Sequence, residues 1–210
     1  AQVRVTGNPV FDRLGDPQLP RRAAALRSAL GWGAEIKVIT WASQPETADP
    51  QLPRRIEGAL LAALADHPAW HLVLRPHPSD RYQLPPCSAQ VSHSGRADDL
   101  PALLAASDVL VTMTSTVGLE AVLVGTPMVT WDLSQNTHEC PYSAMGLSRG
   151  VTSLGDLAPA ITETLRRKKT IGHGIDGQVH GQAVGPALGQ AAARVADEVL
   201  DQLGLAKPTA

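Results

Sequence analysis

The residues best suited to bind a ligand form a hydroxyl-rich turn that follows an apolar run. Residues 108–111 read DVLV and residues 112–121 read TMTSTVGLEA, a pattern that predicts a buried strand followed by a helix. The start of a helix offers unpaired backbone N–H groups and the positive end of the helix dipole. With the hydroxyls of Thr114, Ser115 and Thr116 these groups could hold a phosphate, and Gly118 belongs to the same expected site. Plain helix capping by these side chains is the alternative.

Glu120 lies about one turn into the expected helix. A carboxylate at that place can accept hydrogen bonds from both hydroxyls of a ribose. The turn as a whole therefore predicts a site for the diphosphate and ribose of a nucleotide-linked substrate. A solvated glutamate without a ligand is the alternative.

A second group of candidate residues follows another strand-like run, at Arg75-Pro76-His77-Pro78. We treat His77 and Arg75 as the candidate catalytic residues, because each could act on phosphate oxygens. His77, fixed by a proline on each side, could instead hydrogen-bond only to the backbone. Arg75 could neutralise a phosphate or could pair with Asp80 at the surface.

Polar residues at other turns could border the same ligand. Gly7 and Asn8 form a tight turn near the start of the chain, and Asp132 and Gln135 follow a run at residues 127–131. Ligands gather at the carboxyl ends of parallel strands, so Asp132 and Gln135 could read the hydroxyls of a donor sugar. Trp131 and Tyr142 could stack on a ring, although isolated aromatic residues beside strands usually belong to the core.

No metal site is expected. The chain has seven histidines and two cysteines, Cys87 and Cys140, and none of them shows ligand spacing for zinc. Unpaired thiols fit a reducing, cytoplasmic environment. No run of about 18 apolar residues is present.

The elements that must position these residues alternate along the chain. Short β-branched runs predict strands, and Ala/Leu-rich stretches between them predict helices. The expected strands are residues 3–6, 35–41, 71–74, 89–91, 108–112 and 127–131. The best-marked helices are residues 53–65, 154–168 and a terminal helix at 191–204, preceded by a Gly-rich loop at 171–190. This alternation predicts one α/β domain over residues 1–210, with a doubly wound, mostly parallel, Rossmann-like sheet and helices on both faces.

The composition agrees with that fold and excludes several functions. Hydrophobic residues make up 43% of the chain and aromatic residues only 3%, so Ala, Val, Leu and Ile must fill the core. With 18 basic and 20 acidic residues the net charge is -2, which is too small to collect nucleic acid or an anionic membrane. Any bound anion must be held locally.

Taken in order, these motifs resemble the carboxyl-terminal half of GT-B glycosyltransferases and of the related UDP-N-acetylglucosamine 2-epimerases. The resemblance runs from Val5 to about Val151 and also includes residues 125–129, which read GTPMV. It implies that the turn at residues 114–116 holds a pyrophosphate and that Glu120 holds the ribose. It also places His77-Pro78 near the phosphates and sugar, and Gly7-Asn8 at the cleft between two domains.

The chain departs from the epimerase pattern at two places. Epimerases carry Asp-Ser-Gly-Gly where residues 113–116 read MTST, and they carry an Arg-Asp pair and an acid-rich tail where residues 131–139 read WDLSQNTHE. The Ser/Thr-rich turn followed by Gly-Leu-Glu-Ala looks more like transferases of surface-polysaccharide pathways.

The resemblance implies that the chain binds a nucleotide-sugar donor, UDP- or CMP-linked, as a substrate and uses no cofactor. A missing amino-terminal domain would bind the acceptor and supply the base, and the chain would meet the inner membrane only through that acceptor. The start of the chain almost inside an expected strand favours such a preceding segment. Two alternatives stay open: 2-epimerisation, and a non-catalytic nucleotide-binding module.

Overall fold

A single parallel sheet forms the centre of the molecule. The computed structural model describes residues 3–166 and 189–205. Its six strands lie in the order β3-β2-β1-β4-β5-β6, and every neighbouring pair is parallel. The strands are β1 (Lys37–Ala42), β2 (Trp70–Arg75), β3 (Val91–His93), β4 (Val109–Thr112), β5 (Met128–Trp131) and β6 (Arg149–Val151). The expected doubly wound α/β fold is confirmed.

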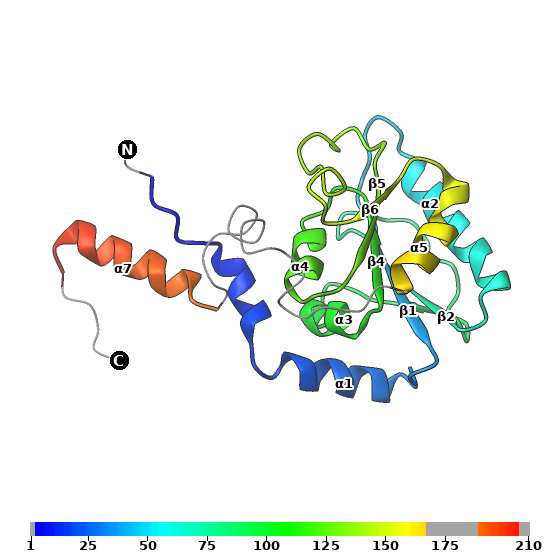
Figure 1. The fold of residues 1–210 in the computed structure, drawn as a ribbon, viewed down its shortest axis with the longest axis horizontal. Helices are drawn as coiled ribbons and strands as arrows, with labels where there is room; N and C mark the ends of the chain where they lie inside the picture. Colours follow the sequence, from blue (N-terminus) through cyan, green and yellow to red (C-terminus); the bar gives the residue numbers. More distant parts are fainter. Residues whose placement is uncertain (1–2, 167–188, 206–210) are drawn as a thin grey trace.

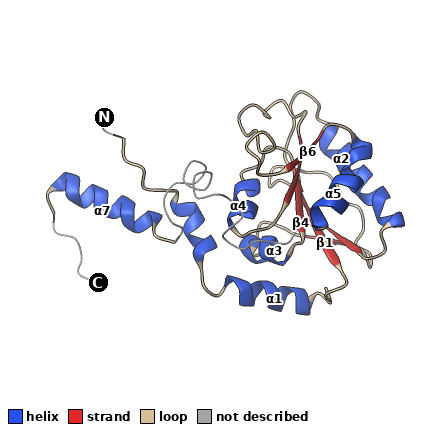
Figure 2. Ribbon diagram, viewed as in Figure 1, coloured by secondary structure: helices blue, strands red, loops and turns tan. Residues whose placement is uncertain are grey.

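Helices cover both faces of the sheet (Figures 1 and 2). The helices α2 (Leu52–Ala63) and α5 (Leu157–Leu165) pack on one face, and α1 (Leu19–Ala29), α3 (Leu100–Ala106) and α4 (Val117–Leu123) pack on the other. Short 3-10 turns, η1 (Pro9–Gly15), η2 (Leu64–Asp66) and η3 (Leu154–Asp156), and the terminal helix α7 (Ala191–Leu203) complete the described elements.

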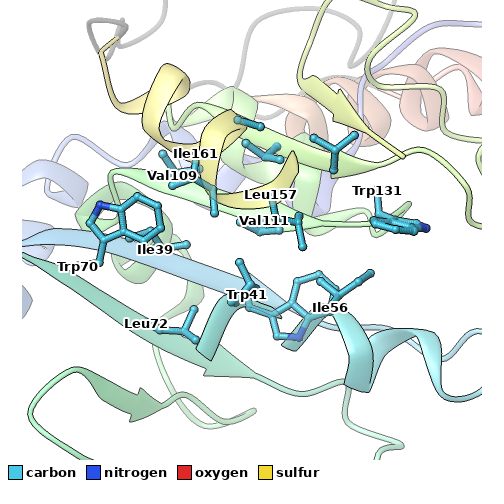
Figure 3. Close-up of a cluster of buried hydrophobic side chains, with 14 of the residues drawn as sticks. Ile39, Trp41, Ile56, Trp70, Leu72, Val109, Val111, Trp131, Leu157 and Ile161 are labelled. Carbon is cyan, nitrogen blue, oxygen red and sulfur yellow. The ribbon is translucent and has the colours of Figure 1, made fainter. Parts of the chain in front are cut away.

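The larger core cluster lies between the sheet and the two helices α2 and α5 (Figure 3). Ile39, Val109 and Val111 of the central strands meet Ile56 of α2 and Ile161 of α5, and all five side chains are at most 1% exposed. Burying an aliphatic side chain of this size stabilises a fold by roughly 1.5–3 kcal/mol. This layer is therefore what holds the strand ends, and the loops that leave them, in fixed places.

The strand order reverses between β1 and β4, because the chain runs outward to β2 and β3 and then returns to the other side of β1. The connections after β1 and after β4 lead to α2 and α4, which lie on opposite faces. A crevice opens between the two loops at such a switch point, which is where ligands of this fold class bind.

Most expected elements are present, with three differences. Residues 3–6 form no strand, because no strand among residues 3–166 and 189–205 pairs with them, and Val3 and Val5 are 83% and 71% exposed. Strand β6 was not expected, because its sequence Arg-Gly-Val lacks a β-branched run and is fixed only by pairing with β5. The helix expected from residue 154 begins as the η3 turn, where the Ser153 hydroxyl accepts from Gly155 N, and α5 itself starts only at Leu157.

The expected terminal helix is confirmed, whereas nearly all of the Gly-rich loop, residues 171–188, lies outside the described residues. Gly204 ends α7 with a φ of 67°, a left-handed conformation that suits glycine. Within the part of the chain that the structure describes, every helix is too short or too polar to cross a membrane.

Helix α7 and η1 lie side by side, away from the sheet (Figure 1). Asp12 of η1 joins them, because its Oδ1 accepts from Ala191 N at 2.8 Å and its Oδ2 accepts from Ala192 N at 2.9 Å. The side chain thus satisfies two free N–H groups at the start of α7 from the opposite end of the chain. The hydrogen bonds from Ala192 and Ala191 lower the pKa of the Asp12 carboxyl below its usual value.

The Asp12 contact makes the docking of α7 dependent on pH. The stabilisation is complete above the ordinary pKa of 3.8 and is lost as the pH falls through the lower value of the folded chain. Replacing Asp12 by Ala should lower the amide protection factors of Ala191 and Ala192 at neutral pH, measured by hydrogen exchange. The surface variant Asp66→Ala should leave them unchanged, and equal protection in both variants would contradict the capping role.

Candidate functional site

A polar pocket of about 280 Å³ lies where the carboxyl ends of β1, β2, β4 and β5 meet. It is lined by Gln44, Pro45, His77, Thr114, Ser115, Thr116, Asn136, Glu139 and Cys140. The pocket thus combines loops that are far apart in the sequence and sits over the reversal of strand order between β1 and β4. His77 and Ser115 lie at the same edge of the sheet, as expected from the two strands that they follow.

The side-chain amide of Gln44 holds the first residue of the hydroxyl-rich turn at residues 114–116. Gln44 donates from Nε2 to Thr114 Oγ1 at 2.7 Å and accepts from Thr114 N through Oε1 at 3.0 Å. Both polar groups of Thr114 are therefore used inside the protein. The backbone N–H groups of Ser115 and Thr116, in contrast, donate to no acceptor in the described ranges 3–166 and 189–205. Those two amides and the Thr116 hydroxyl have no protein partner there, and the hydroxyls of Thr114 and Ser115, which accept from Gln44 and from Val117 N, keep their own protons to donate to a ligand.

A buried phenol fixes the other side of the same turn. Tyr142 is 2% exposed, and its hydroxyl donates to the carbonyl oxygen of Ser115 at 2.8 Å. Burial raises the pKa of this phenol well above its usual value, so it stays a donor at every physiological pH. Tyr142 therefore belongs to the core rather than to a surface that stacks on a ligand, and the same holds for Trp131, which is 7% exposed.

Gly118 has a packing role that the sequence did not suggest. A Cβ atom at this position would lie 2.9 Å from Met128 Sδ and 2.9 Å from the Tyr142 ring. The absence of a side chain is what lets the ring of Tyr142 approach the turn. Gly118 is buried and does not line the pocket, so it supports the site from behind.

His77 lies at the exposed rim with one ring nitrogen already used. Its Nδ1 accepts from Ser79 N at 3.2 Å and lies 2.7 Å from Ser79 Oγ. An acceptor role for Nδ1 assigns the proton of the neutral ring to Nε2. The Nε2–H group is then a donor without a partner among the described residues, on a residue that lines the pocket.

Glu120 and Arg75 do not line this pocket, and each has other partners in the protein. The Glu120 carboxylate is buried and accepts from Arg13 Nη2 at 2.7 Å. Arg75 donates from Nη1 to Ser94 Oγ and to Gly95 O, both at 2.7 Å, instead of pairing with Asp80. Burial lowers the pKa of the Arg75 guanidinium, and the negative charges of Asp98 and Glu120 partly offset this lowering.

The remaining expected site residues also have protein partners. Asp132 accepts from the hydroxyls of Thr130 and Ser143. The backbone N of Gln135 donates to the buried Glu46 carboxylate at 3.1 Å, and its side-chain amide donates to the hydroxyl of Thr47. Neither lines the pocket, although Asn136 beside Gln135 does.

The turn at Gly7 and Asn8 leads into η1, which packs against α7, and neither residue lines the pocket. Asn8 Oδ1 accepts from Val10 N at 3.0 Å and caps η1, while Gly7 has a φ of 86°. A sequence can show such a turn but not which other segment it faces.

Sequence reasoning missed Gln44, Pro45, Glu139 and Cys140 as pocket residues. Gln44 and Pro45 follow an apolar strand after one intervening serine, so their place at the carboxyl edge was open to prediction from the strand pattern. Glu139 and Cys140 lie in a long loop without regular structure, so no periodic signal marks them.

The lining of the pocket contains no arginine or lysine among the described residues, and its carboxylate, Glu139, is 66% exposed at the side chain. No group of three or more His, Cys, Asp or Glu residues within the described ranges could hold a metal ion. The site therefore offers an anion neutral N–H and O–H donors instead of a formal positive charge.

No protein-family model and no curated protein sequence matches the chain. Solved structures share its fold. The UDP-GlcNAc 2-epimerase from Neisseria meningitidis bound to UDP-GlcNAc has a TM-score of 0.63 at 16% identity, over 95% of this chain and 56% of that one. The wall teichoic acid polymerase TagF has a TM-score of 0.63 at 16% identity, over 96% and 52%. The glycosyltransferase of kitacinnamycin has a TM-score of 0.52 at 22% identity, over 83% and 44%.

These similarities confirm, at the level of fold, the resemblance to GT-B glycosyltransferases and 2-epimerases. The chain spans about half the length of each of these structures.

The Gln44 contact yields a test of the site's architecture. Replacing Gln44 by Ala leaves the Thr114 N–H and hydroxyl without partners, so the free energy of unfolding in urea should fall by about 1–3 kcal/mol. The matched variant Gln18→Ala, at an exposed residue whose side chain has no hydrogen bond within the described ranges, should stay within about 0.5 kcal/mol of the native chain. Equal stability of the two variants would show that the amide bridge does not support the turn.

Proposed function

We propose that the pocket binds the diphosphate of a nucleotide-linked sugar, and that the chain is the donor-binding half of a GT-B-type glycosyltransferase. The observation that carries this proposal is the pair of unused amides at Ser115 and Thr116, held open at the strand switch point by Gln44 and Tyr142. The fold similarity to an epimerase bound to UDP-GlcNAc and to glycosyltransferases supports it.

The pocket would hold only part of the donor. Small-molecule pockets begin at about 300 Å³, and a cavity of about 280 Å³ suits a diphosphate with little more. The ribose would lie outside the cavity, beside Glu120, if Arg13 shares that carboxylate with the ligand. Asp132 and Gln135 stay candidates for the sugar only if their present partners are displaced.

The chemistry would consist of stabilising a leaving group. Transfer of the sugar leaves negative charge on the departing phosphate, and fixed donors aimed at that charge lower the barrier without moving. Ser115 N, Thr116 N and the Nε2–H of His77 would supply such donors here. Arg75 would contribute through its long-range field, because its own hydrogen bonds are made to Ser94 and Gly95.

The rest of the reaction would require a second domain. A base for the acceptor hydroxyl and an acceptor-binding wall would come from an amino-terminal half, consistent with the half-length coverage of the similar structures. A surface-polysaccharide acceptor, a cytoplasmic location and contact with the inner membrane through that acceptor are part of the same proposal.

Epimerisation is the second candidate, because a 2-epimerase is among the structures of highest TM-score. Product analysis with a UDP-sugar separates the two reactions: inversion at C2 indicates epimerisation, and a glycosylated acceptor indicates transfer. A stand-alone module would bind the nucleotide and give neither product.

Binding is testable by calorimetric titration with UDP, CDP and GDP. Replacing Thr116 by Val removes one hydroxyl that bonds to charged phosphate, and such a bond contributes about 1.5–3 kcal/mol. Affinity for the preferred nucleotide should therefore fall about ten- to hundredfold. The matched variant Thr152→Val changes an exposed hydroxyl beyond β6 and should bind like the native chain. The absence of heat with all three nucleotides would refute the proposal.

Residues 1–210 alone should bind the donor and transfer no sugar. Holding donor and acceptor together contributes several kcal/mol to catalysis, and this advantage is absent without an acceptor-binding wall. Release of nucleoside diphosphate from a panel of nucleotide sugars and glycan acceptors measures turnover, and restoring an upstream domain should recover it. Acceptor-dependent turnover by the chain alone would show that its base lies among residues assigned here to structure.

A further inference from the structure

The loop that carries His77 is fastened to the body of the protein by a carboxylate. Asp80 Oδ2 accepts from Ser43 Oγ at 2.9 Å and from His77 N at 3.3 Å, and Asp80 N donates to His77 O at 2.8 Å. The backbone of His77 is therefore bound to Asp80 at both its N–H and its carbonyl. Ser43 precedes Gln44, so the same carboxylate joins the His77 loop to the loop that holds the hydroxyl-rich turn.

Helix α2 contributes the charges that fix Asp80. Arg54 Nη2 lies 3.6 Å from Asp80 Oδ2, while Arg54 Nη1 donates to Glu57 Oε2 at 3.0 Å. Tyr82, on the same loop as Asp80, donates its hydroxyl to Glu57 Oε2 at 2.6 Å, and the Arg54 guanidinium lies over the Tyr82 ring. The loop is thus attached to α2 through Asp80 and again through Tyr82.

This network is largely removed from water. The side chains of Glu57, Asp80 and Arg54 are 7%, 18% and 27% exposed. A buried carboxylate that loses one donor keeps its desolvation cost, so each member depends on the others. His77, in contrast, is exposed, and its ring bonds only to Ser79 of its own loop among the described residues. The place of His77 over the pocket is therefore decided by its backbone and by whatever holds that backbone.

We propose that Arg54, Glu57, Asp80 and Tyr82 form a positioning network that holds His77 at the pocket. The inference rests on the proposed function, because the ligand that His77 meets is taken to be a nucleoside diphosphate. None of the four residues lines the pocket. Their effect on a ligand must therefore pass through neighbouring groups: through the loop that bears His77 and, for Asp80, also through Ser43 beside Gln44.

Three substitutions probe the network, and two of them, Tyr82→Phe and Asp80→Asn, change the volume of the side chain little. Tyr82→Phe removes the hydroxyl on Glu57 and keeps the ring beneath Arg54. Asp80→Ala removes the acceptor for Ser43 and His77, whereas Asp80→Asn keeps a side-chain oxygen that can accept from both and should restore part of the effect. Each variant of residues 1–210 is first checked for cooperative urea unfolding, and hydrogen exchange then measures the protection of the amides of residues 77–82.

UDP titration supplies the functional readout. We expect Tyr82→Phe and Asp80→Ala to increase exchange in residues 77–82 and to weaken UDP binding about three- to tenfold, because His77 is displaced from the phosphate rather than removed. The double variant Tyr82→Phe/His77→Ala should bind UDP no more weakly than His77→Ala alone, since Tyr82 acts through His77. An NMR signal of the His77 Cε1–H that broadens in Tyr82→Phe would be a further sign of a displaced ring.

The outcomes separate this inference from the function on which it rests. Unchanged exchange in Tyr82→Phe and Asp80→Ala, or affinity losses of Tyr82→Phe and His77→Ala that multiply in the double variant, would overturn the positioning network. If the native chain binds no nucleotide, the proposed function fails, and the exchange and NMR measurements decide by themselves whether the network holds His77.

Discussion

The pairing of β1 with β4 is the constraint on which the site depends. These strands run parallel with Thr40 opposite Leu110 and Trp41 opposite Val111, and the buried Thr112 hydroxyl donates to Ala42 O at 2.9 Å. This register places Gln44, just after β1, beside Thr114, just after β4. The side-chain amide of Gln44 can then bond both the N–H and the hydroxyl of Thr114. A shift of this register would separate the two loops and leave the turn at residues 114–116 without its support.

The site is built from neutral donors because the nearby charges are neutralised by protein partners. Glu120 pairs with Arg13, and Arg54 joins Glu57 to Asp80. The buried Glu46 carboxylate accepts from Ser134 Oγ at 2.7 Å and from Gln135 N, and so connects the β1 loop to the β5 loop. The positive charges near the pocket are therefore already used inside the protein, and a carboxylate such as Glu120 can offer a ligand only the acceptor sites that its partner leaves. Fixed amides and hydroxyls are what remain to meet a phosphate.

Helix α7 differs from the rest of the domain in how it is held. Buried apolar side chains hold the sheet, whereas α7 is joined to η1 through the Asp12 carboxylate and to the residues before η1 through Arg194 Nε to Thr6 O and the Arg4–Glu198 ion pair. Polar contacts of this kind contribute less than an apolar core and respond to pH and salt. Helix α7 is therefore expected to detach at a lower free energy than the sheet unfolds.

The sequence by itself determined the class of fold, five of the six strands, the terminal helix and the place of the hydroxyl-rich turn, because hydrophobic periodicity and helix-start signals are local. It also indicated that Ser115 and His77 share one edge, since parallel strands end on the same side. The tertiary structure alone decided which polar groups are free: Gln44 occupies Thr114, Arg13 occupies Glu120, and Ser94 and Gly95 occupy Arg75. These partners lie many residues away along the chain, so only the folded register of the sheet brings them together.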